Sequence, residues 1–180
     1  MVNLVAKRLV SFTIRYWIVA AVMFGVCGMW SNAAAADVDQ LLQQASSQAF
    51  QLRRDSATLE SFTRSRVSWQ SQAAQVNTIR AHVNQMGQPL SQLQAARDSA
   101  GKPYQQAIDR IQPLLQELAS NTTSIIDHLN QNPRRLMDPT YRDYLRANAD
   151  LASNLAAQTS NIVAFANAER RFQELQAKVG

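Results

Sequence analysis

Residues 104–129, YQQAIDRIQPLLQELASNTTSIIDHL, decide the fold because they carry the most regular apolar pattern in the chain. Side chains suited to a packed seam recur there at alternating steps of four and three residues: Tyr104, Ile108, Ile111, Leu115, Leu118, Thr122, Ile125 and Leu129. This spacing places them on one face of an α-helix and is typical of helices that pack nearly parallel to their neighbours. Gly101 and Pro103 mark the start of the predicted helix, and Asn132–Pro133 mark its stop.

Three further helices are predicted around this segment. Apolar residues keep helical spacing over residues 58–98, and again from Asp138–Pro139 to the end of the chain. A shorter stripe over residues 37–57 fades at Arg53–Asp55. Short connections make successive helices antiparallel neighbours. We therefore expect an all-α fold, namely an up-down antiparallel helical bundle of four helices, one short and three long.

The predicted helix lengths differ. At about 1.5 Å per residue, the first helix reaches ~30 Å, whereas the second and fourth reach ~60 Å. The first helix would then cover only part of the bundle and leave three helices at the end around residues 80–100. Met86, Leu90 and Leu93 at that end would form either a closed small core or an apolar groove for a partner.

The first 36 residues have the pattern of an export signal. Lys7, Arg8 and Arg15 precede an apolar run over residues 16–30, and small residues follow at Ala33–Ala36. We expect a signal peptide over 1–36 that is cleaved after Ala36, leaving 37–180 as a single helical-bundle domain in the periplasm or outside the cell. The alternative is an uncleaved inner-membrane anchor, because residues 16–36 are long enough for a membrane-spanning helix, which needs about 20 residues.

Composition limits the functions open to the mature chain. The sequence has 18 Lys and Arg against 13 Asp and Glu, and three of the basic residues but no acidic residue fall in the leader. The remaining domain is nearly neutral, so we expect no nucleic-acid partner, and a membrane partner only if the leader is uncleaved. Cys27 is the one cysteine and also falls in the leader. Residues 37–180 therefore lack a thiol nucleophile, a disulfide and a cysteine metal ligand.

No pattern for catalysis stands out. His82 and His128 lie on different predicted helices, and antiparallel pairing separates them by about 15 Å of helix rise, too far to share a metal. The sequence has no nucleophile elbow, no glycine-rich phosphate loop and no carboxylate pair of unusual spacing. We expect no catalytic residues, no metal site and no cofactor.

Arginine residues are concentrated near one end of the predicted bundle. In an up-down bundle the first and third connections share one end, and six of the arginines near that end form a candidate anion site: Arg64, Arg66, Arg134, Arg135, Arg142 and Arg146. Their forked donors suit a carboxylate or a phosphate. The alternative is that nearby Asp and Glu side chains neutralise them as solvated ion pairs.

Polar side chains also interrupt the apolar seams. Antiparallel pairing sets Arg80, Thr122 and Asn148 at about the same height. Such a layer either fixes the register of the helices, as a buried Asn does in coiled coils, or lines a small polar pocket.

Two functions from different classes remain open. The first is an exported, non-catalytic scaffold of the cell envelope that contacts an envelope protein partner or another copy of itself. The second is an extracytoplasmic bundle that binds a small ligand or an anion.

Overall fold

The computed structural model describes residues 31–65 and 67–179, and every regular element in them is helical. The long helices are α1 (Ser31–Ser61), α2 (Trp69–Ala96), α3 (Lys102–Gln131) and α4 (Pro139–Val179). Two short 3₁₀ turns, η1 (Phe62–Arg64) and η2 (Arg97–Ser99), extend the ends of α1 and α2. The predictions of an all-α chain and of four helices are confirmed. Most of the predicted signal peptide or anchor, residues 1–30, lies outside the described residues.

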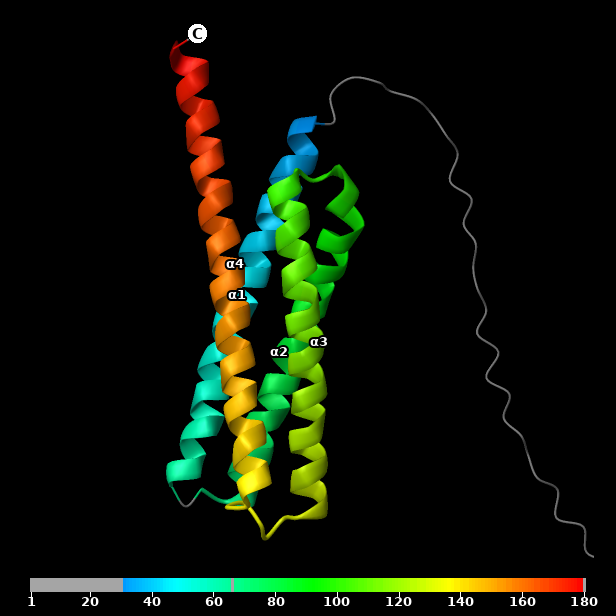
Figure 1. Cartoon of the computed structure of the whole chain (residues 1–180), viewed down its shortest axis with the longest axis vertical. Coiled ribbons are helices and arrows are strands. Elements are labelled where there is room, and N and C mark those ends of the chain that lie inside the picture. Colours follow the sequence, from blue (N-terminus) through cyan, green and yellow to red (C-terminus); the bar gives the residue numbers. More distant parts are fainter. Residues whose placement is uncertain (1–30, 66, 180) are drawn as a thin grey trace, which may run out of the picture.

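The four long helices lie side by side (Figure 1). Helix α1 packs against α2 and α4, and α3 packs against the same two helices. Their inward side chains form one hydrophobic cluster, to which all four helices contribute. Its largest fully buried members are Leu42, Leu52, Leu59, Ile79, Met86, Leu93, Ile108, Ile111, Leu118, Ile125, Tyr141 and Leu145.

The apolar seam of α3 is buried along its length. The seven seam positions from Ile108 to Leu129 are all buried, and Tyr104 at the start of the helix is half-buried. Full burial of each Leu or Ile side chain contributes about 1.5–3 kcal/mol relative to exposure. Helix α3 therefore supplies a continuous wall of the core.

The predicted boundary between the first two helices is wrong. Helix α1 continues past Arg53–Asp55, and Ser56 and Leu59 extend its buried face to within two residues of its end. Arg53 and Arg54 are exposed and Asp55 is half-buried against α2, so three consecutive charged residues look in sequence like the end of an apolar stripe. Helix α2 starts only after Ser68, whose side-chain oxygen accepts the backbone N–H of Ser71 as an N-cap.

The helix lengths also differ from the prediction of one short and three long helices. Helices α1, α2 and α3 have 31, 28 and 30 residues, whereas α4 has 41. Because α1 is long, the expected three-helix end around residues 80–100 is absent from the described part of the chain. Met86 and Leu90 are buried there in the same core as Val38 and Leu42. Instead, α4 alone extends beyond the other helices at its C-terminal end (Figure 1).

Candidate functional site

A buried polar cluster joins three helices inside the core. The Ser56 hydroxyl of α1 donates to Asn148 Oδ1 of α4 at 2.8 Å. Asn148 Nδ2 donates to Thr122 Oγ1 of α3 at 3.0 Å, and the Thr122 hydroxyl donates to the Leu118 carbonyl at 2.7 Å. All three polar side chains are buried. The cluster therefore ties α1, α3 and α4 together at one height.

The structure thus brings two of the three predicted layer residues, Thr122 and Asn148, into contact, but Arg80 does not join them. Arg80 is exposed, because it follows the fully buried Ile79 by one residue and so lies about 100° round the helix from the core. Ser56 takes the third place. Sequence reasoning missed it because the apolar stripe of the first helix was expected to fade at Arg53–Asp55, just before Ser56.

A second polar cluster lies where α2 and α4 begin. The Tyr141 hydroxyl donates to Gln72 Oε1 at 2.8 Å, and Gln72 Nε2 donates to the Val67 carbonyl at 3.1 Å. Gln72 and Tyr141 are buried, and burial raises the pKa of Tyr141. The His128 ring stacks on Tyr141 with centroids 4.9 Å apart. These contacts fix the connection between α1 and α2 against the helices.

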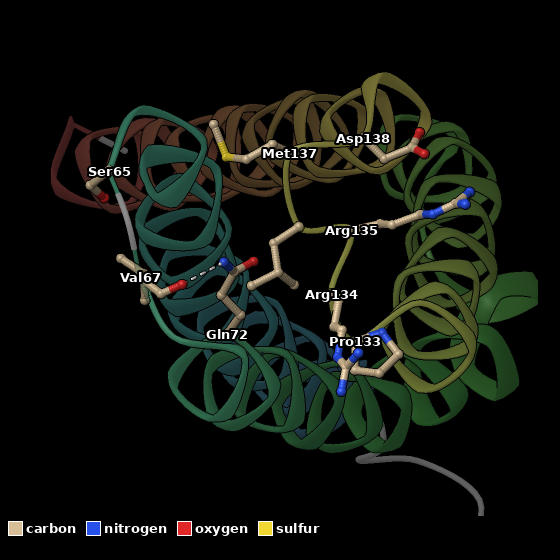
Figure 2. A pocket seen from close by; sticks show the side chains of 9 residues that line it. Ser65, Val67, Gln72, Pro133, Arg134, Arg135, Met137 and Asp138 are labelled. Carbon is tan, nitrogen blue, oxygen red and sulfur yellow. Dashed lines mark hydrogen bonds between the residues drawn. The ribbon is translucent and has the colours of Figure 1, made fainter.

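A pocket of about 460 Å³ opens at the same end (Figure 2). It lies between the connection from α1 to α2 and the connection from α3 to α4. Its lining residues are Ser65, Val67, Gln72, Pro133, Arg134, Arg135, Leu136, Met137 and Asp138. The floor residue Gln72 already has hydrogen-bond partners for both ends of its amide.

The structure does not gather the predicted arginines around one ligand. Arg134 and Arg135 line the pocket, but Figure 2 shows their side chains extending in different directions. The guanidinium of Arg64 donates two hydrogen bonds to Glu60, at 2.9 and 2.7 Å. Arg142 and Arg146 are exposed on α4 and do not line the pocket.

Arg66, the sixth predicted residue, lies outside the described residues. Sequence reasoning placed these arginines at one end of the bundle, but it had no means of predicting the directions of long side chains on neighbouring turns.

The two histidines occupy separate environments. His82 Nδ1 lies 2.7 Å from Asp55 Oδ2, which links α2 to α1, whereas His128 packs between Tyr141 and Tyr144. Within the part of the chain that the structure describes, no three His, Cys, Asp or Glu side chains gather as a metal site requires.

The C-terminal part of α4 is the largest apolar feature left exposed. Phe165, Phe172, Leu175 and Val179 are 41%, 60%, 61% and 89% exposed. The last buried residue of the helix is Ala166, and every residue from 171 to 179 is exposed. We call residues 165–179 the α4 tip.

Contacts with α3 and α1 hold only the base of the α4 tip. The Tyr104 ring meets Phe165 edge to face at 6.0 Å between centroids, and its hydroxyl donates to Glu169 Oε2 at 3.1 Å. Arg170 lies 4.0 Å from Asp39 of α1. Beyond these contacts no other described helix runs beside α4 (Figure 1).

Over residues 31–65 and 67–179, no helix is both long enough and apolar enough to cross a membrane. No known protein family, curated protein or solved structure matches this chain.

Proposed function

We propose that this chain is an exported, non-catalytic helical-bundle protein of the cell envelope that acts as a scaffold through protein–protein contact. The export pattern of residues 1–36 supports the location. The packing of α1 and α3 each against α2 and α4 supports an up-down arrangement of the four helices. Two hydrogen bonds between helix ends support the same arrangement. Tyr104 at the start of α3 donates to Glu169 in the last part of α4, and Trp69 at the start of α2 donates to the Leu129 carbonyl near the end of α3.

The observation that carries the proposal is the exposed apolar surface of the α4 tip. Isolated exposed apolar residues are normal on monomers, but a contiguous apolar patch marks a surface that meets a partner. Four of the six exposed large hydrophobic side chains among the described residues fall on the last 15 residues of α4. The fold itself does not require Phe172, Leu175 and Val179, because the last buried residue of α4 is Ala166.

Photo-crosslinking in the cells that produce the protein tests this proposal. A photoreactive amino acid replaces Phe172, and a matched variant carries it at Ser160, which is exposed on the same helix. We expect the variant at residue 172, and not that at residue 160, to form a discrete adduct with another protein. The absence of an adduct at residue 172, or equal adducts at both positions, would contradict the scaffold function.

Intact mass after cell fractionation tests the location. Export with cleavage predicts a species that begins at Asp37 in an extracytoplasmic fraction. A full-length species in the membrane fraction would instead support the anchored alternative. A full-length species in the cytoplasmic fraction would contradict export.

The pocket favours a second candidate function, the binding of a small carboxylate or phosphate. Its volume of about 460 Å³ falls within the about 300–1,000 Å³ of typical ligand sites. A ligand at 100 times its dissociation constant adds about 2.7 kcal/mol to stability. A thermal-shift screen of carboxylates and phosphates should then give a shift that disappears in Arg134→Ala or Arg135→Ala and persists in Arg146→Ala. No shift with any compound would contradict this candidate.

A further inference from the structure

The apolar residues of the α4 tip form one stripe. Residues seven apart lie almost directly above one another on a helix of 3.6 residues per turn, so Phe165, Phe172 and Val179 are aligned. Leu175 and the small residue Ala168 lie beside them, three residues after Phe172 and Phe165. All five side chains are exposed.

The most buried face of α4 does not continue into this stripe. That face carries Leu155, Thr159, Ile162 and Ala166, all buried. Its continuation passes through Glu169, Arg170 and Gln173, which are polar. The stripe lies about 100° round the helix from it, on the side of α4 that faces α3, where Tyr144 meets His128 and Phe165 meets Tyr104. The stripe therefore extends the α3-facing side of α4 past the end of the bundle at which α3 begins.

The charges along the stripe are unequal on its two sides. On one side of the stripe, Arg171 and Lys178 lie beside Leu175. On the other side lie the uncharged Gln176 and, two turns before it, Glu169. Glu169 already accepts the Tyr104 hydroxyl, and Arg170 lies near Asp39. Among the described residues, no ion pair involves Arg171 or Lys178. One edge of the stripe thus carries two positive charges that form no ion pair among the described residues, and the exposed Glu174 lies behind them.

We propose that the α4 tip binds an amphipathic helix of another protein, whose apolar positions are flanked by Asp or Glu. This proposal rests on the scaffold function and names the chemistry of the partner. The apolar stripe of the partner would pack on Phe172 and Leu175 as in a coiled coil, and its acidic side chains would meet Arg171 and Lys178. Such flanking charges set which partner is accepted and how fast it associates.

A second copy of this chain fits the stripe less well. Antiparallel pairing of two α4 tips sets Arg171 of one copy beside Lys178 of the other, so like charges meet along the basic edge.

A lipid surface also fits less well. Helices that lie on membranes carry a polar face rich in Lys and Arg. The α4 tip has three basic residues, but Glu169 and Glu174 accompany them. Its small net charge favours a protein partner over an anionic bilayer.

Two synthetic peptides test the proposal directly. Both are three-heptad amphipathic helices with Leu at the a and d positions; one carries Glu at the e and g positions, and the other carries Lys there. Binding to the purified native protein is measured by fluorescence anisotropy. We expect the Glu peptide to bind at least about tenfold more tightly than the Lys peptide, with the difference shrinking as salt rises.

Variants assign the binding to the stripe. Phe172→Ala combined with Leu175→Ala should weaken binding of the Glu peptide by about tenfold or more. The matched control is Phe50→Ala, since Phe50 is 47% exposed on α1 away from the tip. Arg171→Glu combined with Lys178→Glu should reverse the preference toward the Lys peptide. All these side chains are exposed, so each variant should keep the far-UV circular dichroism of the native protein.

Several results would overturn the proposal. Equal binding of both peptides would contradict a partner helix flanked by Asp or Glu. Binding that survives the Phe172→Ala and Leu175→Ala changes would contradict binding at the stripe. Sedimentation of the protein with phosphatidylglycerol vesicles that is lost in Phe172→Ala would assign the stripe to a membrane. A dimer in analytical ultracentrifugation that is lost in Phe172→Ala would assign it to a second copy. If residue 172 still crosslinks to another protein in cells while the peptides bind equally, the scaffold function stands and only the partner chemistry fails.

Discussion

Asn148 uses both ends of one amide to hold three helices in register. Its oxygen accepts from Ser56 of α1, and its nitrogen donates to Thr122 of α3. Because the group is buried, each of these hydrogen bonds is strong, and each partner left alone would carry a full desolvation penalty. The cluster consequently sets the relative heights of the helices more sharply than the apolar side chains around it.

Replacement of Asn148 by Ala should destabilise the protein by about 2–4 kcal/mol, because Ser56 loses its acceptor, Thr122 loses a donor and a cavity remains. The matched control is Asn154→Ala on the exposed side of α4, which should change stability by less than about 0.5 kcal/mol. Urea denaturation at neutral pH measures both. Equal effects of the two changes would show that the cluster is not a source of stability.

Tyr141 should make stability depend on alkaline pH. Burial raises its pKa above the ordinary value of 10.0. Below that value both states keep the proton, and stability is complete. As pH rises above it, the unfolded state loses the proton first, so the free energy of unfolding falls by up to about 1.4 kcal/mol per pH unit for this group.

Tyr141→Phe should therefore flatten the decline in urea midpoint above pH 10. Part of the decline should remain, since burial, aided by the hydrogen bond to Glu169, also raises the pKa of Tyr104. At neutral pH the same change should cost about 1–2 kcal/mol, because Gln72 Oε1 loses its donor. An unchanged alkaline slope would contradict the role of Tyr141.

At the scale of the helices, α3 was the easiest element to predict and α1 the hardest. The seam of α3 is apolar at each step, so its pattern indicates helix, face and length together. The end of α1 was misplaced because Arg53–Asp55 interrupt the apolar pattern, while the buried face of the helix continues through Ser56 and Leu59. A buried serine carries no apolar signal, and its partners in α3 and α4 are distant in sequence.

Gly87 lowers the stability of helix α2, and alanine can replace it without a steric clash. A glycine inside a helix is less favourable than alanine by about 0.5–1 kcal/mol, and a Cβ added at Gly87 would meet no atom within 4 Å. Gly87→Ala should therefore raise the free energy of unfolding by about that amount. The reverse change at an exposed position of the same helix, Ala81→Gly, should lower it comparably. Destabilisation by Gly87→Ala in urea denaturation would show that the glycine serves a purpose other than helix formation.

At the scale of the whole molecule, the excess length of α4 separates stability from the exposed apolar stripe. Removal of residues 171–179 deletes no buried side chain, so stability should change by less than about 0.5 kcal/mol. Removal of residues 162–179 also deletes the buried Ile162 and Ala166 and should cost more than about 2 kcal/mol. Urea denaturation of the two truncated proteins checks this difference. A large loss from the shorter deletion would mean that the α4 tip is part of the folded core.

The pocket and the α4 tip lie at opposite ends of the molecule (Figure 1), so the fold holds these two surfaces far apart. Helix α4 alone spans 41 residues, or about 60 Å, and its N-terminal part packs against α1 and α3. Helical segments are stiffer than flexible linkers, so the distance between their ends varies less. The pocket and the α4 tip are therefore held at a fixed separation. Insertion of one heptad into each helix would lengthen that separation by about 10 Å without altering either surface.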